Sequence, residues 1–267
     1  MLDAHAHLTD PRFASDVTAV VERARAMGVT RILTCGEDLE SSVAAIELAA
    51  RHPDVRVAVG VHPHRAASWS ETTAARLVEL ARDDRVVAIG EAGMDLSGRS
   101  APHAEQERAL RAQLAMAELL GLPIVLHVRD AGGEVRAIVD ELALPGDAVR
   151  LRGMVHCYSE GPAEVGDWNA RGFLLSFAGT VTYPGSERLR EAARAVGAAG
   201  LLVESDAPYL APQPHRGRRN EPAYVAETLA ALAGIRGVSA RTLAETVDAN
   251  ARRLFGPRWN LGAPARV

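Results

Sequence analysis

The sequence predicts an α/β fold: a single-domain, parallel (β/α)8 TIM barrel with a C-terminal helical extension. Eight short runs rich in Val, Ile and Leu alternate with longer segments of helical periodicity, which is typical of a parallel sheet covered by helices. The chain has 267 residues, and a barrel of this size is ordinary as one domain. A doubly wound open sheet is the alternative, but the first strand lacks the glycine-rich phosphate turn of dinucleotide-binding folds.

The predicted strands are brief apolar runs, as expected for strands buried on both faces of a sheet. They cover residues 2–7, 31–35, 56–61, 86–91, 123–128, 153–157, 173–177 and 201–204. The predicted helices cover residues 16–27, 41–51, 71–82, 105–120, 132–142, 162–170, 186–196 and 222–233, with a final one over 239–254. In the fourth helix Leu110, Leu114 and Ala117 fall on one face. We expect the barrel domain to span 1–256 and a tail, which Trp259 could dock, to span 257–267.

Composition excludes several classes of protein. The 30 basic and 34 acidic residues nearly balance, so the chain lacks the overall positive charge of a protein that coats nucleic acid. It has no apolar run long enough for a membrane span and no leader peptide, and its two cysteines, Cys35 and Cys157, fit a reducing compartment. We therefore expect a cytoplasmic protein without a membrane partner. Every basic residue is arginine, so neither a Schiff base nor a carbamylated lysine can form.

Two histidines one residue apart, His5 and His7, end the first predicted strand. Side chains two apart on a strand point the same way, so both imidazoles face one point in space. This arrangement suits a divalent metal ion. Taken alone, the pair could equally be hydrogen-bonded core residues, and the other metal-binding residue types decide between the two interpretations.

Metal-binding residue types recur at the ends of the predicted strands, where barrels of this type build their active sites. The candidate ligands are His5, His7, Glu91, His127, His156 and Asp206. Six ligands exceed the three that one catalytic zinc usually takes, so we predict two divalent cations. Because the chain has no lysine, Glu91 is the natural bridging group between them. His5, His7 and Asp206 would complete one site, and His127 with His156 the other.

Two carboxylates are candidates for catalytic work besides the bridging Glu91. Asp206 would orient the water between the metals and accept its proton, which makes a hydroxide nucleophile. Glu204 lies two residues earlier on the last predicted strand and should face the same interior. We expect Glu204 to hold a metal ligand in place from behind.

The order and spacing of these motifs resemble the TatD family of metal-dependent hydrolases and deoxyribonucleases, within the amidohydrolase superfamily. The motifs are Asp3-Ala-His-Ala-His-Leu8, Gly60-Val-His-Pro-His64, Gly90-Glu-Ala-Gly-Met-Asp95, Leu126-His-Val-Arg-Asp130, Val155-His-Cys-Tyr-Ser159, Glu204-Ser-Asp-Ala-Pro-Tyr-Leu-Ala-Pro212, His215-Arg-Gly-Arg-Arg-Asn-Glu-Pro222 and Asn250-Ala-Arg-Arg-Leu-Phe255. The resemblance implies a barrel, a two-metal centre holding magnesium, manganese or zinc, and hydrolysis of phosphodiester bonds in DNA as an exonuclease. Single strands or ends would be the substrate, and the protein would be a monomer or a weak oligomer.

Three positions depart from the usual family pattern. Leu96-Ser97-Gly98-Arg99 stands where aromatic residues and an arginine are common, Val128 replaces a common serine, and Glu160 replaces a common glycine. The loss of aromatic residues could remove a stacking surface for bases. A glutamate at position 160 would repel a polyanion unless it is paired or turned away.

Four further residues are candidates for binding substrate. His62 and His64 follow the third predicted strand and could hydrogen-bond a phosphate oxygen, although capping or packing is the alternative. Arg129 and Arg216 could clamp a phosphate, although both could be solvated loop residues. Cys157 should point away from the metals, because neighbours on a strand alternate in direction.

The leading functional hypothesis is therefore a metal-dependent deoxyribonuclease. The alternative is a hydrolase of a small amide, ester or lactone, because the same metal pair polarises a carbonyl group. A non-catalytic barrel is a third possibility, but such a scaffold has no need of six converging ligands. A basic groove leading to the metals would favour DNA, and a closed apolar pocket a small substrate.

Overall fold

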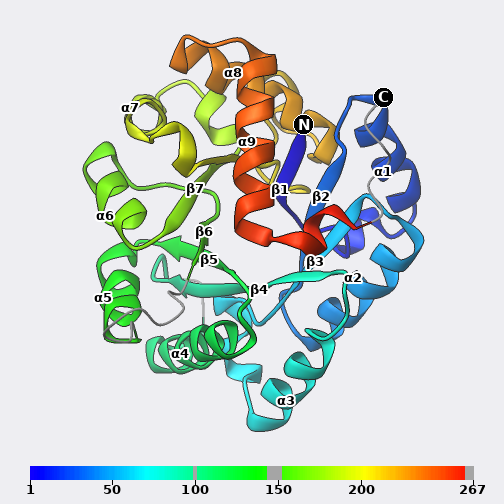
Figure 1. The fold of residues 1–267 in the computed structure, drawn as a ribbon, viewed down its shortest axis with the longest axis vertical. Helices are drawn as coiled ribbons and strands as arrows, with labels where there is room; N and C mark the ends of the chain where they lie inside the picture. The colour runs from blue at the N-terminus through cyan, green and yellow to red at the C-terminus, as the bar shows by residue number, and fades with distance from the viewer. Residues whose placement is uncertain (99–100, 143–151, 262–267) are drawn as a thin grey trace.

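Eight parallel strands form the barrel that the sequence predicts (Figure 1). The computed structural model describes residues 1–98, 101–142 and 152–261. Each strand pairs with the next in chain order. The strands are β1 (Leu2–Ala6), β2 (Arg31–Cys35), β3 (Val55–Val59), β4 (Val86–Asp95), β5 (Ile124–Arg129), β6 (Gly153–Val155), β7 (Phe173–Phe177) and β8 (Leu201–Val203). The ring is closed by a parallel bridge between Ala6 and Ala207, just after β8.

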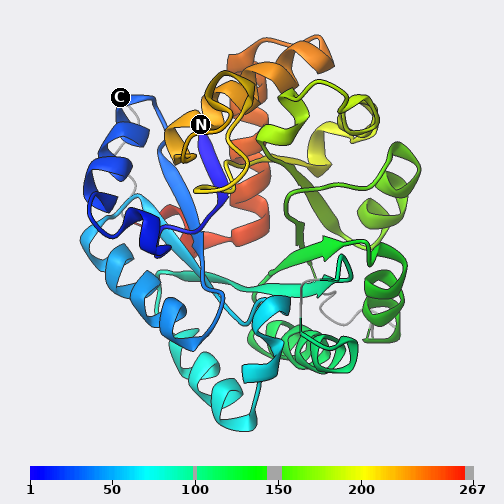
Figure 2. The same ribbon diagram turned by 180° about the vertical axis from the view of Figure 1, so that it is seen from behind.

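Helices surround this sheet on its outer face (Figures 1 and 2). They are α1 (Val17–Ala26), α2 (Leu39–Arg51), α3 (Glu71–Leu80), α4 (His103–Leu120), α5 (Gly132–Leu142), α6 (Val165–Ala170), α7 (Glu187–Ala195), α8 (Val225–Arg236) and α9 (Ala240–Phe255). A large apolar core fills the space between helices and strands. Over the described ranges, no helix combines the length and the apolar character needed to cross a membrane.

The last helix covers the barrel end opposite the strands' carboxyl ends. In Figure 1 α9 runs across the mouth of the barrel, and its Leu254 and Phe255 join one apolar cluster with interior strand residues such as Val125 and Met154. A short 3-10 helix, η8 (Pro257–Asn260), follows α9. Its Trp259 is fully buried.

Arginines at the starts of the strands fix this C-terminal segment. Arg31 Nε donates to the Trp259 carbonyl oxygen at 2.9 Å, and Arg56 Nε donates to the Arg258 carbonyl oxygen at 2.9 Å. Trp259 also stacks on Phe255, with 4.7 Å between ring centroids. Trp259 therefore docks the beginning of the tail, as the sequence suggested. Residues 262–267 of the tail and Arg99 lie outside the described residues, and the domain boundary at residue 256 stays a prediction.

Two strands contain an irregularity at the residues that matter most for function. The three-residue step from Ile89 to Ala92 in β4 stands opposite the two-residue step from Ile124 to Leu126 in β5, so β4 has one extra residue here. Glu91 lies in this interruption. The prediction that β4 ends at Glu91 is wrong, because pairing with β5 resumes and continues to Asp95. A similar shift lies in β1 between Asp3 and Ala6, the stretch that contains His5, and such bulges re-aim side chains beside active sites.

Candidate metal centre

The structure brings all six predicted ligands together, with Glu91 in the middle. Glu91 Oε2 lies 3.1 Å from His5 Nε2 and 3.4 Å from His7 Nε2. Glu91 Oε1 lies 2.8 Å from His127 Nδ1 and 2.7 Å from His156 Nε2. The two oxygens of one buried carboxylate thus face two different groups of imidazoles. This is the arrangement expected of a group shared by two cations.

The first group consists of His5, His7 and Asp206. Its two histidine Nε2 atoms are 3.1 Å apart, and Asp206 Oδ1 is 3.7 Å from each of them. Glu91 Oε2 is buried and, among the described residues, has no hydrogen-bond partner. A buried, unpaired carboxylate oxygen is costly, and a cation between these four side chains would satisfy it. The donor set therefore fits a divalent metal ion.

Backbone geometry after β8 places Asp206 in this group. Asp206 has a φ of 56°, in the left-handed region that side chains rarely adopt. Its amide donates to the His5 carbonyl oxygen at 3.0 Å. The preceding Ser205 is held by the buried Asp3, which accepts hydrogen bonds from the Ser205 amide at 2.8 Å and hydroxyl at 2.5 Å. The start of β1 thus positions the loop that carries Asp206.

The second group consists of His127 and His156, each with a carboxylate behind it. His127 Nε2 lies 3.3 Å from Asp95 Oδ2, and His156 Nδ1 lies 3.4 Å from Glu204 Oε1. A carboxylate at the outer nitrogen favours a proton there. The inner nitrogen, which faces Glu91, then keeps its lone pair for a cation. Glu204 therefore lies where a group that orients a ligand should lie.

His62 also contacts Glu91, but its hydrogen bonds give it a role different from that of the candidate metal ligands. His62 Nδ1 accepts a hydrogen bond from the His64 amide at 3.1 Å. In the neutral ring the proton must then be on Nε2, which lies 3.2 Å from Glu91 Oε1. His62 is therefore arranged as a hydrogen-bond donor rather than a metal ligand. His64 contacts Asp95 instead, with Nε2 3.0 Å from Oδ2.

Sequence reasoning missed three residues of the centre. Asp95 and Asp3 occur in the quoted motifs but received no role, and Cys35 lies behind a ligand, with Sγ 3.3 Å from His5 Nδ1. Asp95 had a detectable signal. It follows Glu91 at an interval of four, which puts both on one face of a continuing strand, but β4 was predicted to stop too early.

Burial and neighbouring charges shift the protonation of these groups. Burial raises the pKa of Asp206 to about 7, and burial lowers the pKa of His5 to about 4. For His156, burial favours the neutral ring, but the charge of Glu91 outweighs it and holds the pKa well above its usual value. For Glu91, burial is outweighed by the surrounding imidazoles, which hold its pKa well below the usual range. Glu91 therefore stays ionised, and Asp206 can exchange a proton near neutral pH.

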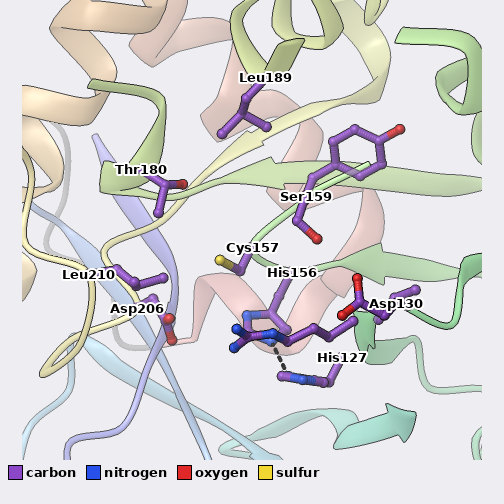
Figure 3. A pocket seen from close by; sticks show the side chains of 12 residues that line it. His127, Asp130, His156, Cys157, Ser159, Thr180, Leu189, Asp206 and Leu210 are labelled. Carbon is purple, nitrogen blue, oxygen red and sulfur yellow. Dashed lines mark hydrogen bonds between the residues drawn. The ribbon is translucent and has the colours of Figure 1, made fainter. Parts of the chain in front are cut away.

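A cavity of about 430 Å³ opens beside the second group. Figure 3 shows His156, Asp206 and Cys157 around the same hollow. The prediction that Cys157 points away from the metals is wrong. β6 ends at Val155, and Cys157 has a φ of 43°, so the alternation of a strand no longer applies at this position.

The predicted substrate residues lie at different distances from this cavity. Arg129 lines it and makes no side-chain hydrogen bond or ion pair with any described residue. Arg216 does not line it, and its guanidinium lies 4.6 Å from the centroid of the Tyr183 ring. Glu160 is paired with Arg136 at 2.9 Å and accepts a hydrogen bond from Trp168 at 2.6 Å. Its charge is therefore compensated, and the expected repulsion of a polyanion is reduced.

A parallel (β/α)8 barrel with this cluster of imidazoles and carboxylates at its rim defines a metal-dependent hydrolase. Comparison with known proteins gives the particular family. The family model described as TatD related DNase matches residues 2–256. The chain belongs to the TatD family of metal-dependent hydrolases, which confirms the resemblance found in the sequence.

Relatives cover nearly the whole chain. The protein is 38% identical to the 3'-5' ssDNA/RNA exonuclease TatD of Klebsiella pneumoniae (strain 342), over 96% of this chain and 98% of the relative. It is 35% identical to the uncharacterized metal-dependent hydrolase YabD of Bacillus subtilis (strain 168), with the same coverage. The crystal structure of YjjV, a TatD homologue from Escherichia coli K12, superposes with a TM-score of 0.89 at 28% identity, over 96% of this chain and 98% of that chain.

Proposed function

We propose that this protein is an exonuclease that hydrolyses phosphodiester bonds of DNA at single strands or ends, with two divalent cations. The observation that carries the proposal is the shared carboxylate, since the two oxygens of Glu91 face separate imidazole groups at 2.7–3.4 Å. The name of the Klebsiella pneumoniae relative, a 3'-5' ssDNA/RNA exonuclease, supports a nucleic-acid substrate.

The ligand assignment follows the two groups of side chains. His5, His7 and Asp206 would hold one cation, His127 and His156 the other, and Glu91 both. When bound, magnesium, manganese or zinc would activate a water molecule and withdraw charge from the phosphoryl group. This is the chemistry that in-line displacement at a phosphodiester needs.

The chain's own side chains supply the remaining steps. Asp206 would be the proton acceptor, because its carboxylate lies beside the first group, 3.7 Å from both histidine Nε2 atoms. Glu204 is a positioning residue that keeps the His156 ring in place. His62 would hold the shared carboxylate through its Nε2 proton, beside the phosphoryl group, and Arg129 would provide a cationic side chain in the cavity. His64 and Arg216 lie farther out, where they would contact the strand rather than the scissile phosphate.

The cavity favours a phosphodiester over the alternative substrate. A small amide, ester or lactone was expected to need a closed apolar pocket. Instead, the lining combines Arg129, Asp130, Ser159 and Thr180 with Leu189 and a few other apolar residues. Such a lining suits a polar ligand, and Arg129 is the group in it that would attract a phosphate.

The test is cleavage of end-labelled single-stranded DNA by metal-stripped protein that is resupplied with magnesium, manganese or zinc. Glu91→Gln should lose activity by more than the roughly 10–100-fold typical of outer-shell changes at metal sites, together with metal content. Glu79→Gln, which changes an exposed carboxylate on α3, is the matched control and should behave as wild type. Absence of cleavage by protein that holds two metals would contradict the proposal.

A further inference from the structure

Aromatic side chains are scarce in this protein, and nearly all of them are shielded. The chain has three Trp, four Tyr and four Phe residues, all within the described ranges. Of these, Tyr209 is the one classed as exposed, at 39%. An exposed aromatic ring in such a sparse set calls for an explanation, because a surface ring contributes little to folding.

Tyr209 is held rigidly by the loop that follows β1. The guanidinium carbon of Arg12 lies 4.2 Å from the centroid of the Tyr209 ring. Arg12 is itself fixed by Asp10, to which its Nε and Nη2 donate at 2.9 and 2.8 Å. The Tyr209 hydroxyl also donates to Asp10, with 3.2 Å to Oδ2, so the same carboxylate holds both Arg12 and Tyr209. The result is a preorganised stack of a guanidinium on a phenol ring.

This stack stands at the edge of the metal centre. The Tyr209 ring is edge-to-face with the ring of His7, with 5.8 Å between centroids. The next residue, Leu210, lines the cavity (Figure 3). Asp206, three residues before Tyr209 in the same loop, lines it as well. The loop after β8 therefore contributes both to the cavity and to the exposed ring.

Resting on the proposed function, we propose that the Arg12–Tyr209 stack is a nucleobase subsite. It receives the base next to the terminal nucleotide, while the terminal nucleotide occupies the cavity beside His127 and His156. Bases stack readily on aromatic rings and on guanidinium planes.

The chemistry of the subsite is stacking rather than charge neutralisation. Asp10 already compensates the charge of Arg12, so the stack offers a flat surface with little net charge. Loss of the ring should therefore weaken binding without changing its salt dependence, whereas loss of a phosphate contact reduces the salt slope. The subsite should accept any base, because every base has a π face.

The experiment measures KM and kcat for wild type and Tyr209→Leu on a single-stranded oligodeoxynucleotide. The same oligonucleotide is also made with a reduced abasic residue next to the digested end. We expect Tyr209→Leu to raise KM about 10-fold on the intact strand with kcat little changed. The abasic strand should raise the KM of wild type by a similar factor. Tyr209→Leu acting on the abasic strand should show no further rise in KM, because the substitution and the missing base remove the same contact. Tyr209→Phe and Tyr209→Trp should restore the wild-type KM.

Two controls separate stacking from damage. A thymidine p-nitrophenyl phosphate diester lacks the second base, so Tyr209→Leu should hydrolyse it like wild type, which also reports a folded protein. Arg76→Leu removes an exposed, carboxylate-paired arginine on α3 and should leave all constants unchanged. A normal KM for Tyr209→Leu on the intact strand, or additive effects with the abasic strand, would overturn the subsite alone. Failure of wild type to cleave any strand would overturn the proposed function and the subsite with it.

Discussion

The imidazoles of the cluster differ in what stands behind the outer nitrogen. Asp95 stands behind His127, and Glu204 stands behind His156 at an ion-pair distance of 3.4 Å. The thiol of Cys35 stands behind His5, whereas His7 Nδ1 has no hydrogen-bond partner among the described residues. Outer partners fix the tautomer and orientation of a ligand. The two carboxylates therefore prepare the second group for a cation more firmly than the neutral thiol prepares the first.

The contact of Asp95 with His127 leads to a prediction about metal affinity. Asp95→Asn keeps the shape of the side chain but removes the charge that holds the proton on His127 Nε2. Metal affinity at the second group should fall about 10–100-fold, with little change in thermal unfolding of the metal-free protein. Titration with Mn²⁺ or Co²⁺ measures this. Asp140→Asn, at an exposed aspartate paired with Arg171, is the control, and equal affinities for the two variants would refute the role of Asp95.

Metal uptake should depend on pH, because buried ligands carry protons that a cation must displace. Burial raises the pKa of Asp206 to about 7, so below pH 7 its proton competes with the metal. Affinity should therefore rise with pH, about tenfold per unit for each displaced proton. The rise should continue above pH 7, because burial of His156 is outweighed by the charge of Glu91, which holds the pKa of His156 well above its usual value. Calorimetry in two buffers of different ionisation enthalpy counts the released protons. Uptake that is independent of pH between 6 and 8 would contradict this assignment.

The members of the cluster could be predicted because barrels place catalytic side chains at known positions. The structure brings together all six candidate ligands: His5, His7, Glu91, His127, His156 and Asp206. For His62 the sequence predicted a substrate contact, which stays a prediction, but not the contact with Glu91, since its tautomer depends on the His64 amide, a contact set by the fold of a loop. Tertiary contacts of this kind leave no periodic signal in a sequence.

At the scale of elements, the apolar pattern of the sequence predicts where strands and helices lie. The residues at which a strand begins and ends depend on the neighbouring strands in the sheet. β2 and β7 match their predicted bounds, because apolar residues predominate in both strands. β4 runs past its predicted end, since β5 continues to offer backbone partners. The bulge that contains Glu91 was not predictable either, because it reflects register between strands rather than residue preference.

The start of α5 offers a test with neighbouring glycines. A Cβ on Gly132 would lie 2.0 Å from Glu160 Oε1, whereas a Cβ on Gly133 meets nothing within 4 Å. Gly132→Ala should therefore displace Glu160 from Arg136 and destabilise the protein by about 1–3 kcal/mol. Gly133→Ala should stabilise it by about 0.5–1 kcal/mol, because alanine favours helices. Denaturant unfolding of both variants measures these changes. Equal free energies of unfolding for the two variants would contradict the prediction.

For the whole molecule, the two ends of the barrel have separate tasks. The carboxyl ends of the strands carry the candidate metal centre, and the opposite end is filled by α9 and η8. Arg31 and Arg56 bind backbone carbonyls of η8 there. Such a division lets stability and chemistry be altered independently.

Substitution of Trp259 tests how much the barrel end covered by α9 and η8 contributes to stability. It is fully buried against Phe255, so Trp259→Ala should lower the free energy of unfolding by about 3–5 kcal/mol. Metal affinity of the folded protein should be unchanged, because the centre lies at the other end. Chemical denaturation and metal titration provide the two measurements. Loss of metal binding by folded Trp259→Ala would show that the two ends are coupled.

The bridge that closes the barrel also determines when, during synthesis, the cluster can form. His5 and Ser205 stand 200 positions apart along the chain, and a ribosome delivers them in that order. The first two histidines must wait until Asp206 has emerged and its backbone has joined β1. A nascent or prematurely terminated chain that stops before β8 therefore lacks one wall of the first metal position.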